Sequence, residues 1–246
     1  LYISVGFILE EGFPMETLWR VVKSVQEAAE RAKVNIVTGD TKVVDKGKGD
    51  GMYINTSGIG IIEHGIEVSP AKVEQGDLVL LSGDIGRHGI TIMSAREELA
   101  LESEIMSDTS PLSDLVMELL EQSIEVHCMR DLTRGGLGSA LIEIAVTSGT
   151  HIYINENTIP VSREVQATCE ILGLDPLYVA NEGRFIAFVQ PSDAEAALKI
   201  MQSSNPEASL IGSVETNPSG IVTVNNTIGS NCIIELLCCD LLPQNC

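Results

Sequence analysis

The chain has 246 residues, of which 44% are hydrophobic, and it carries a formal charge of −20. This hydrophobic fraction excludes an intrinsically disordered protein, and the length allows one large or two ordinary domains. The acidity excludes a protein that binds nucleic acid or anionic membranes through a basic surface. Any phosphorylated ligand must therefore be bound by backbone N–H groups, a metal ion or a few focused cations.

The sequence shows no segment that would direct it into or across a membrane. No apolar run approaches the ~20 residues that a spanning helix needs, and no basic leader with a cleavage site is visible. Six cysteines without such a leader are expected to be reduced thiols, so we expect a cytoplasmic location. Because the chain begins at Leu1 inside an apolar run and without a methionine, we also expect upstream sequence to be missing.

Hydrophobic periodicity predicts one helix between strands in the first 62 residues. The helix covers residues 15–32, and Pro14 stands at its start, where a missing N–H costs nothing. One face of this helix carries Leu18, Val21, Val22, Val25, Ala29 and Ala32. The neighbouring elements are a strand at 1–9, a strand at 35–44 that a polar loop at T-G-D-T interrupts, a flexible turn at 45–51, and a strand pair or one long strand at 52–62.

Strands and helices alternate through the rest of the chain. Strands are predicted at 78–83, 126–130, 152–155 and 184–190, with short strands around 210, 222 and 233. Helices are predicted at 88–99, from 110 to about 119, and at 138–147, 163–172 and 193–202. The connections are irregular and hairpin-like near the end, which favours an α+β fold with mixed sheets over a doubly wound parallel sheet.

The stretch V-T-G-D-T-K-V-V places Asp40 and Lys42 at a glycine-containing turn inside an otherwise apolar strand. Charged side chains are costly to bury there unless they are paired or bind a metal. In one interpretation, Asp40 is a Mg²⁺ ligand and Lys42 faces a phosphate or a developing negative charge. In the other, the turn is solvated and the two residues form an ordinary ion pair. The spacing alone leaves both open.

The stretch R-D-L-T-R-G-G-L-G, residues 130–138, follows a predicted strand and leads into a predicted helix. A helix N-terminus binds anions, and glycines let the backbone approach a ligand closely. A glycine pair more often only turns the chain, but the polar neighbours here favour a phosphate-binding turn. The residues are Asp131, Thr133, Arg134, Gly135 and Gly136. The sequence contains neither a P-loop nor a GxGxxG dinucleotide motif.

Two weaker candidates are Glu182 in A-N-E-G-R and His88 in G-R-H-G. A carboxylate beside a glycine bend can act as a general base if its surroundings raise its pKa, although such a residue is more often solvated. His88 stands at a helix start, where it could shuttle protons, bind phosphate or only cap the helix. The remaining histidines have no partners at metal-ligand spacing and are expected to be structural: His64, His127 and His151.

The cysteines fall into two groups. Cys128 and Cys169 lie on apolar faces and are expected to pack as small hydrophobic residues. The others crowd the end of the chain, at Cys232, Cys238, Cys239 and Cys246. They allow a structural zinc or a redox tail as an alternative, but no C-x-x-C pair occurs and an adjacent Cys-Cys binds one metal poorly.

Several stretches occur in a single order: G-F-I-L-E-E-G-F-P-M-E-T-L, V-T-G-D-T-K-V-V-D-K-G-K-G-D-G-M-Y-I-N-T-S-G-I-G, R-D-L-T-R-G-G-L, N-E-G-R and a terminal cysteine. Together they closely resemble the HypE family of hydrogenase maturation factors. That family belongs to an ATP-binding superfamily with aminoimidazole ribonucleotide synthetase and selenophosphate synthetase. The resemblance covers essentially the whole chain.

The resemblance implies a mixed-sheet, two-domain α+β fold like that of aminoimidazole ribonucleotide synthetase. Residues 1–68 would be the remnant of an N-terminal ATP-binding domain, and residues 69–235 a C-terminal α+β domain. Residues 236–246 would be a flexible tail ending in the acceptor cysteine.

The resemblance also implies a reaction. In this family the carbamoyltransferase HypF loads a carbamoyl group onto the terminal cysteine, and ATP is then used to dehydrate the S-carboxamide to a thiocyanate. Cyanide from it goes to the iron of a nickel–iron hydrogenase, with the HypC–HypD complex as a further partner. A homodimer that binds neither nucleic acid nor membrane is expected.

Carried onto this sequence, the resemblance makes Cys246 the acceptor on a mobile tail. Lys42 and Glu182 would stabilise the activated oxygen and take the proton, and Asp40 would hold Mg²⁺. The residues implied in binding ATP are Asp40, Thr41, Asp131, Thr133, Arg134, Gly135 and Gly136.

The chain departs from the family pattern at three places. An upstream Asp and Asn that complete the ATP site are not in it, the tail reads P-Q-N-C where the family usually has P-R-I-C, and Arg87 stands where the family generally has Asp. Two alternatives stay open. One is a small-molecule ATP-dependent synthetase or kinase of the same superfamily, and the other is a non-catalytic scaffold that docks maturation partners.

Overall fold

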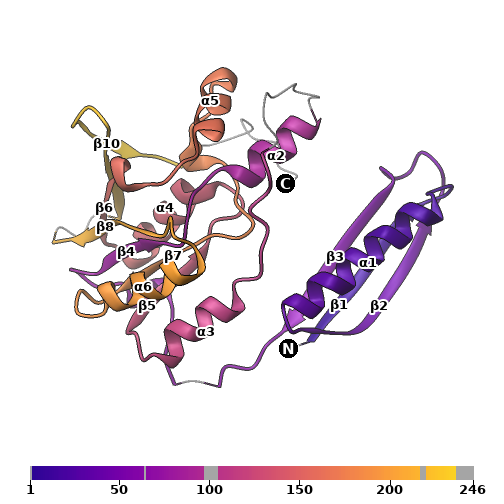
Figure 1. The fold of residues 1–246 in the computed structure, drawn as a ribbon, viewed down its shortest axis with the longest axis horizontal. Helices are drawn as coiled ribbons and strands as arrows, with labels where there is room; N and C mark the ends of the chain where they lie inside the picture. The colour runs from indigo at the N-terminus through magenta and orange to yellow at the C-terminus, as the bar shows by residue number, and fades with distance from the viewer. Residues whose placement is uncertain (1, 64, 97–104, 217–219, 237–246) are drawn as a thin grey trace. The chain divides into compact units, whose positions relative to one another are not determined.

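The computed structural model describes residues 2–63, 65–96, 105–216 and 220–236 of the chain (Figure 1). The protein divides into two units, Leu1–Ile66 and Glu67–Cys246, and each is described by itself. Within the described residues, no helix is both long enough and apolar enough to cross a membrane.

The first unit is a three-stranded sheet with one helix. Its strands lie in the order β2-β1-β3, with β1 parallel to β2 and antiparallel to β3. The elements are β1 (Tyr2–Glu10), α1 (Met15–Arg31), β2 (Asn35–Val44) and β3 (Met52–Ile59). The helix connects β1 to β2, because parallel neighbours cannot be joined by a tight turn. Of the two forms expected for residues 52–62, the structure has one strand.

The predicted apolar face of α1 lies towards the sheet. Val22, Val25 and Ala29 of the helix line a groove of about 320 Å³ together with Val5 and Phe7 of β1. No residue of α1 is fully buried. The helix therefore covers one face of the sheet through half-buried contacts.

The predicted break at T-G-D-T is wrong, because β2 runs without interruption from Asn35 to Val44. Gly39 pairs with Val5 of β1 at a point where a Cβ atom would overlap the Val5 carbonyl oxygen. A glycine there keeps the two strands close and does not form a turn. Asp40 and Lys42 are exposed along the strand, so their charges require no loop.

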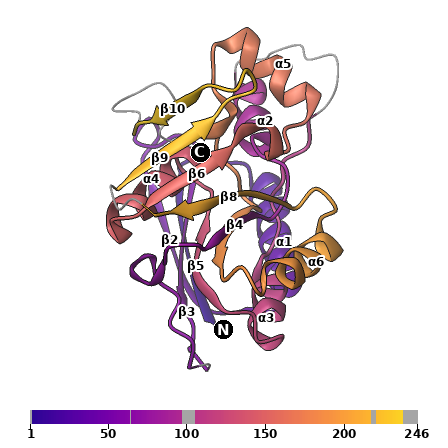
Figure 2. The ribbon, with the colours of Figure 1, turned by 90° about the vertical axis from the view of Figure 1, so that its left-hand side faces the viewer.

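The second unit is built on a seven-stranded sheet in the order β10-β9-β6-β8-β4-β7-β5 (Figure 2). Neighbouring strands are antiparallel except for β6 and β9, which are parallel. The strands are β4 (Leu78–Leu81), β5 (Val126–Asp131), β6 (His151–Asn155), β7 (Phe185–Val189), β8 (Ser209–Glu215), β9 (Ile221–Asn225) and β10 (Asn231–Ile234). The mixed sheets confirm the predicted α+β fold.

Five α-helices lie in the described part of this unit: α2 (Arg87–Arg96), α3 (Ser113–Glu121), α4 (Gly136–Ser148), α5 (Arg163–Leu172) and α6 (Ala194–Ser204). Short 3₁₀ turns form at η1 (Pro70–Lys72), η2 (Glu156–Thr158) and η3 (Pro176–Tyr178). Helix α3 begins at Ser113, later than the start predicted at Ser110-Pro111. The backbone N–H of Ser110 instead donates to the carbonyl of Glu182 over 3.4 Å.

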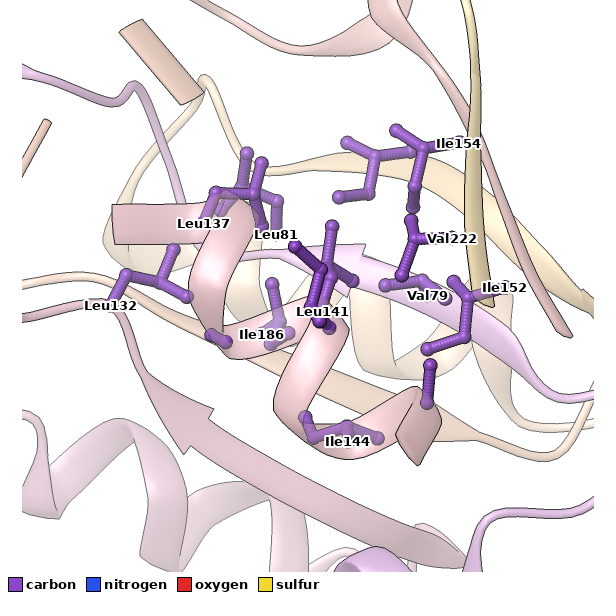
Figure 3. Close-up of a cluster of buried hydrophobic side chains, with 14 of the residues drawn as sticks. Val79, Leu81, Leu132, Leu137, Leu141, Ile144, Ile152, Ile154, Ile186 and Val222 are labelled. Atoms are coloured by element: carbon purple, nitrogen blue, oxygen red, sulfur yellow. The ribbon is translucent and has the colours of Figure 1, made fainter. Parts of the chain in front are cut away.

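The two faces of this sheet are covered by different helices. Val79 and Leu81 of β4 lie in the core formed with α4, whereas Leu80 between them lies in the core formed with α3 and α6. This follows from the alternation of side chains along a strand. Figure 3 shows Leu137 and Leu141 of α4 directed at the strand residues of the larger core.

Cys128 and Cys169 are buried among apolar residues, as the sequence predicted. Burial raises the pKa of both thiols to about 11. These two cysteines are therefore part of the packing and are poor nucleophiles.

Candidate functional site

The glycine-rich turn joins β5 to α4 in the second unit. The strand ends at Asp131 and the helix begins at Gly136, close to the predicted boundaries. Gly135 and Gly136 have φ angles of 79° and 60°, which residues with a side chain rarely adopt. Thr133 Oγ1 donates to Asp131 Oδ2 over 2.9 Å, and Gly136 N donates to the Thr133 carbonyl over 3.0 Å. Internal hydrogen bonds therefore set the shape of the turn.

The start of α4 has the features of an anion-binding site. The N–H groups in the first turn of a helix have no acceptor within the helix, and no acidic residue lies in the first turn of α4. Arg134 is exposed beside it. A Cβ atom on Gly136 would lie 2.7 Å from the carbonyl oxygens of Leu177 and Val179, so only glycine allows this close packing against the η3 loop.

Asn181 connects the glycine-rich turn to two other segments. Its side chain is fully buried, and its Oδ1 accepts a hydrogen bond from Gly86 N over 2.7 Å. Its Nδ2 donates to the carbonyls of Leu132 and Val179, each over 3.1 Å. The backbone N–H of Asn181 also donates to the carbonyl of Leu132 over 3.0 Å. Because Glu182 is the next residue, these bonds fix Glu182 relative to the turn.

Glu182 is half-buried in this loop. Burial raises the pKa of its carboxyl group, and the negative charges of Asp108 and Asp131 raise it further, while His88 acts in the opposite direction. The structure thus brings together Glu182 and Asp131, which the sequence placed in separate motifs. A carboxylate with a raised pKa in a partly enclosed position is suited to accept a proton.

Asp108 belongs to this site but was missed by the sequence reasoning. It is 5% exposed, and its Oδ1 accepts from the N–H of His88 over 3.0 Å. Its Oδ2 accepts from the N–H groups of Glu182 and Gly183 over 3.2 and 3.0 Å. The only available signal was the polar run S-D-T-S-P at residues 107–111, since aspartates in such runs accept backbone hydrogen bonds.

Arg87, one of the three predicted departures from the family pattern, forms an ion pair with a buried carboxylate. Its Nε lies 2.7 Å from Asp84 Oδ2, and Arg184 Nη2 lies 2.6 Å from Asp84 Oδ1. Asp84 is 3% exposed, so the two cations neutralise a charge that would be costly alone. Both arginines also line a cleft of about 370 Å³ beside Asp108 and Gly183.

In the first unit, the strand register defines the surroundings of Asp40. Asp40 pairs with Gly6 of β1, whose other neighbour is Asn55 of β3. The side chains of paired residues lie on the same face of a sheet. Because Gly6 has no side chain, the carboxylate of Asp40 and the amide of Asn55 lie on one open row of that face. Asp40 Oδ1 accepts from Thr41 N over 2.8 Å.

These oxygen ligands suit a hard cation such as Mg²⁺. The described residues contain no group of three or more His, Cys, Asp or Glu side chains that could hold a metal. An ion at Asp40 would therefore take most of its ligands from water or phosphate, which Mg²⁺ commonly does.

Lys42 lies two residues beyond Asp40 and therefore on the same face of β2. Its registered neighbour is Ile8, which pairs in turn with Tyr53. Thr41 points to the opposite face, beside Phe7, and contributes its backbone N–H to Asp40.

The predicted residues are distributed over both units. The first unit holds Asp40, Thr41 and Lys42, and the second holds Asp131, Thr133, Arg134, Gly135, Gly136 and Glu182. Cys246 lies outside the described residues, as do Cys238, Cys239 and His64.

The described histidines each have a polar partner. His88 Nδ1 lies 2.9 Å from Ser107 Oγ, and His151 Nε2 lies 2.8 Å from Thr223 Oγ1. His127 Nδ1 lies 2.9 Å from Asp77 Oδ2. Of these three, only His88 acts electrostatically on Glu182.

Comparison with known proteins identifies the family. Residues 1–62 match the N-terminal domain, and residues 74–225 the C-terminal domain, of the AIR synthase related proteins. The chain is 46% identical to the carbamoyl dehydratase HypE of Azotobacter vinelandii and 40% identical to that of Escherichia coli K12. These alignments cover 100% of this chain and 72% and 73% of the two relatives.

Solved structures agree with this result. A HypE structure in complex with ATP is 41% identical, with a TM-score of 0.95 over 100% of this chain and 75% of that chain. HypE in a HypE–HypF complex is 45% identical, with a TM-score of 0.91 over 96% of this chain and 77% of that chain. Thiamine monophosphate kinase from Aquifex aeolicus, at 19% identity and a TM-score of 0.66 over 91% of this chain and 72% of that chain, shares the fold alone. The predicted resemblance is confirmed, and the chain belongs to the HypE family of carbamoyl dehydratases.

Proposed function

We propose that the chain uses ATP to dehydrate an S-carbamoyl group on Cys246 to a thiocyanate, the source of the cyanide ligand of a nickel–iron hydrogenase. Membership of the carbamoyl dehydratase family supports this reaction. The structural observation that carries it is Glu182, a half-buried carboxyl group with a raised pKa, tied through Asn181 to a glycine-rich helix start. Activation by phosphate followed by removal of a proton requires both features.

The reaction balances in two steps. The oxygen of the S-carboxamide attacks the terminal phosphorus of ATP, so that a C–O–P bond forms, ADP leaves and one amide proton is lost. The remaining N–H proton is then removed, its electron pair completes the C≡N bond, and the C–O bond breaks with release of phosphate. The sum is thiocyanate, ADP and phosphate. Phosphorylation is needed because an amide oxygen is a poor leaving group.

The glycine-rich turn is the proposed phosphate-binding element. Beyond Gly136, whose N–H donates to the Thr133 carbonyl, the N–H groups in the first turn of α4 offer donors to phosphate oxygens, as does the exposed guanidinium group of Arg134. The hydrogen bond from Thr133 holds the Asp131 carboxylate at the edge of the turn. A HypE structure at 41% identity that contains ATP supports nucleotide binding by this chain.

Glu182 is the proposed proton acceptor. A carboxylate with a raised pKa is a stronger base than an exposed one. Lys42 is proposed to stabilise the negative charge that develops on the activated oxygen. Replacing Glu182 decides which of the two residues takes the proton.

Asp40 is the proposed Mg²⁺ ligand, with its carboxylate oriented by the N–H of Thr41. The exposed oxygens of Asp40 and Asn55 on one row of the sheet support this assignment. When bound, Mg²⁺ supplies positive charge that neutralises phosphate oxygens.

The proposed partners are the carbamoyltransferase HypF, the HypC–HypD complex and a second copy of the chain. A solved HypE–HypF complex, whose HypE chain is 45% identical to this one, supports the first of these. A cytoplasmic location is proposed as well. Residues 1–68, 69–235 and 236–246 remain the predicted division into ATP-binding remnant, C-terminal domain and tail.

The test is a single-turnover assay of full-length protein carbamoylated on Cys246. We expect thiocyanate and phosphate in equal amounts, and neither product from Cys246→Ala. Glu182→Gln should bind ATP as the wild type does and dehydrate at least ~100-fold more slowly, the low end for loss of a general base. Glu164→Gln, in the exposed first turn of α5, is the matched control and should keep the wild-type rate. Unchanged dehydration by Glu182→Gln would remove Glu182 from the mechanism.

A further inference from the structure

The carboxylate of Asp108 holds two segments that are distant from it in sequence. Its Oδ1 accepts from His88 N, 20 residues before it, and its Oδ2 accepts from the N–H groups of Glu182 and Gly183, 74 and 75 residues after it. The distances lie between 3.0 and 3.2 Å. One buried side chain therefore fixes the start of α2 and the two peptide groups that flank Glu182.

The backbone around Asp108 holds the same loop from a second direction. Ser110 N donates to the carbonyl of Glu182 over 3.4 Å. A Cβ atom on Gly183 would overlap the carbonyl oxygen of Asp108, so the two backbones can approach only because Gly183 has no side chain. The Glu182 peptide is thus held through both its N–H and its C=O.

The preceding residue orients the imidazole ring of His88. Ser107 Oγ lies 2.9 Å from His88 Nδ1 and 2.7 Å from Thr109 Oγ1. With Asp108 bonded to the backbone of His88, the segment 107–109 fixes both the backbone and the ring of this residue. His88 opposes the rise in the pKa of the Glu182 carboxyl group, so its placement affects the proposed base.

We propose that Asp108 is a positioning residue for the dehydration: it holds Glu182 and His88 in the arrangement in which Glu182 removes the proton. The inference rests on the proposed role of Glu182. Asp108 itself is not placed in contact with the reacting atoms. It acts through three backbone hydrogen bonds, and a displacement of about 1 Å at a catalytic group can slow a reaction about 100-fold.

Asp108 also acts through its charge. The charged groups that act on Glu182 are His88 from α2, Asp131 from the end of β5, and Asp108 itself. Burial and the two aspartates raise the pKa of Glu182, whereas His88 lowers it. Removing the charge at position 108 should therefore lower the pKa of Glu182, and the rising limb of the pH–rate profile should move to lower pH.

The test uses full-length protein with the substitution Asp108→Asn, which keeps the size of the side chain. The asparagine retains one acceptor oxygen and presents N–H donors on the other side, so at least one of the two held segments loses its partner. Asp193→Asn is the matched control, because Asp193 Oδ2 likewise accepts a long-range backbone hydrogen bond, from Glu125 N over 2.8 Å, at another part of the second unit.

Three quantities are measured: the rate of thiocyanate formation against pH, the KM for ATP, and amide hydrogen exchange at Glu182 and Gly183. For Asp108→Asn we expect a rate about 10- to 100-fold lower, an unchanged KM, a rising limb at lower pH and exchange at least about 10-fold faster. Asp193→Asn should match the wild type in all three.

The outcomes separate this proposal from the proposed function. If Asp108→Asn forms thiocyanate at the full wild-type rate, the positioning role is refuted and the proposed function is not. A slower Asp108→Asn variant with an unmoved pH profile and wild-type amide exchange would also refute the positioning role, because the loop and the carboxyl group of Glu182 would then be unaltered. Absence of thiocyanate from carbamoylated wild-type protein would refute the proposed function, and the positioning role with it.

Discussion

The side chain of Asn181 accepts a hydrogen bond from the backbone N–H of Gly86 over 2.7 Å, although 95 residues separate the two in sequence. The amide nitrogen of the same side chain donates to the glycine-rich turn at Leu132 and to Val179. Three loops of the second unit are thus joined at one fully buried group. Buried polar groups of this kind stabilise a single arrangement only while every partner is satisfied.

Asn181→Ala should destabilise the protein by about 2–5 kcal/mol, because it leaves the Gly86 N–H and the Val179 carbonyl without these partners in a buried site. Asn157→Ala is the control, since Asn157 is exposed, and its effect should stay within about 0.5 kcal/mol. Urea denaturation measures both free energies of unfolding. Equal values for the two variants would show that Asn181 does not join the loops.

Gly136→Ala should destabilise the protein more than Gly149→Ala. Both glycines have positive φ angles, 60° and 69°, so alanine at either position costs about 1–2 kcal/mol in backbone conformation. A Cβ atom at Gly136 would also lie 2.7 Å from the carbonyl oxygens of Leu177 and Val179, whereas nothing lies within 4 Å at Gly149. We expect at least about 2 kcal/mol of additional loss at Gly136. A similar loss at both positions would contradict the close packing of the turn.

The His127–Asp77 pair should make stability depend on pH. Burial lowers the pKa of His127, but the hydrogen bond and charge of Asp77, with help from Glu125, outweigh this effect and raise it above 6.5. A raised pKa in the folded state means that the pair stabilises the protein fully below the unfolded value of about 6.5 and less as pH rises through the folded value.

From about pH 6 to about pH 8, the free energy of unfolding should therefore decrease. This decrease should be larger in the wild type than in His127→Gln. His151→Gln is the control, because the His151 ring pairs with the neutral hydroxyl of Thr223. Denaturation curves at the two pH values give the comparison. The same pH dependence in wild type and His127→Gln would show that the pair contributes nothing.

The described cysteines should differ sharply in reactivity. Cys128 and Cys169 are buried, and burial raises the pKa of each thiol to about 11, whereas Cys232 is exposed. At about pH 8, iodoacetamide should alkylate Cys232 in the native protein and leave the two buried thiols unmodified until urea is added. Peptide mass spectrometry distinguishes the sites. Native labelling of Cys128 at the rate of Cys232 would contradict the described core.

The elements that sequence reasoning predicted well are those with a strong period or a strong boundary. Helix α5 was predicted at residues 163–172 and found there, because Ser162 caps its start and Gly173 ends it with a φ of 69°. Strand β2 was predicted with a break, because exposed polar residues on an open face of a sheet resemble a loop in sequence.

The site was predictable where its chemistry lies in short motifs. Thr133 and the two glycines stand within one turn, and Glu182 stands beside a glycine. Asn181 and Asp108 could not be assigned, because their partners are up to 95 residues away and no local pattern records such contacts. The ion pair of Arg87 with Asp84 is local in sequence. Asp84 is also paired with Arg184, which is 100 residues away, and no local pattern predicts this second contact.

In the proposed reaction, the chain removes water from its own carbamoylated terminal cysteine at the expense of ATP. Mass spectrometry of the C-terminal peptide tests it most directly, with full-length protein supplied with the carbamoyltransferase, carbamoyl phosphate and ATP. We expect a carbamoyl adduct on Cys246 that loses one water only when ATP is present. An adduct that keeps its water in the presence of ATP, or a Cys246 left unmodified by a transferase that is active on a control substrate, would contradict it.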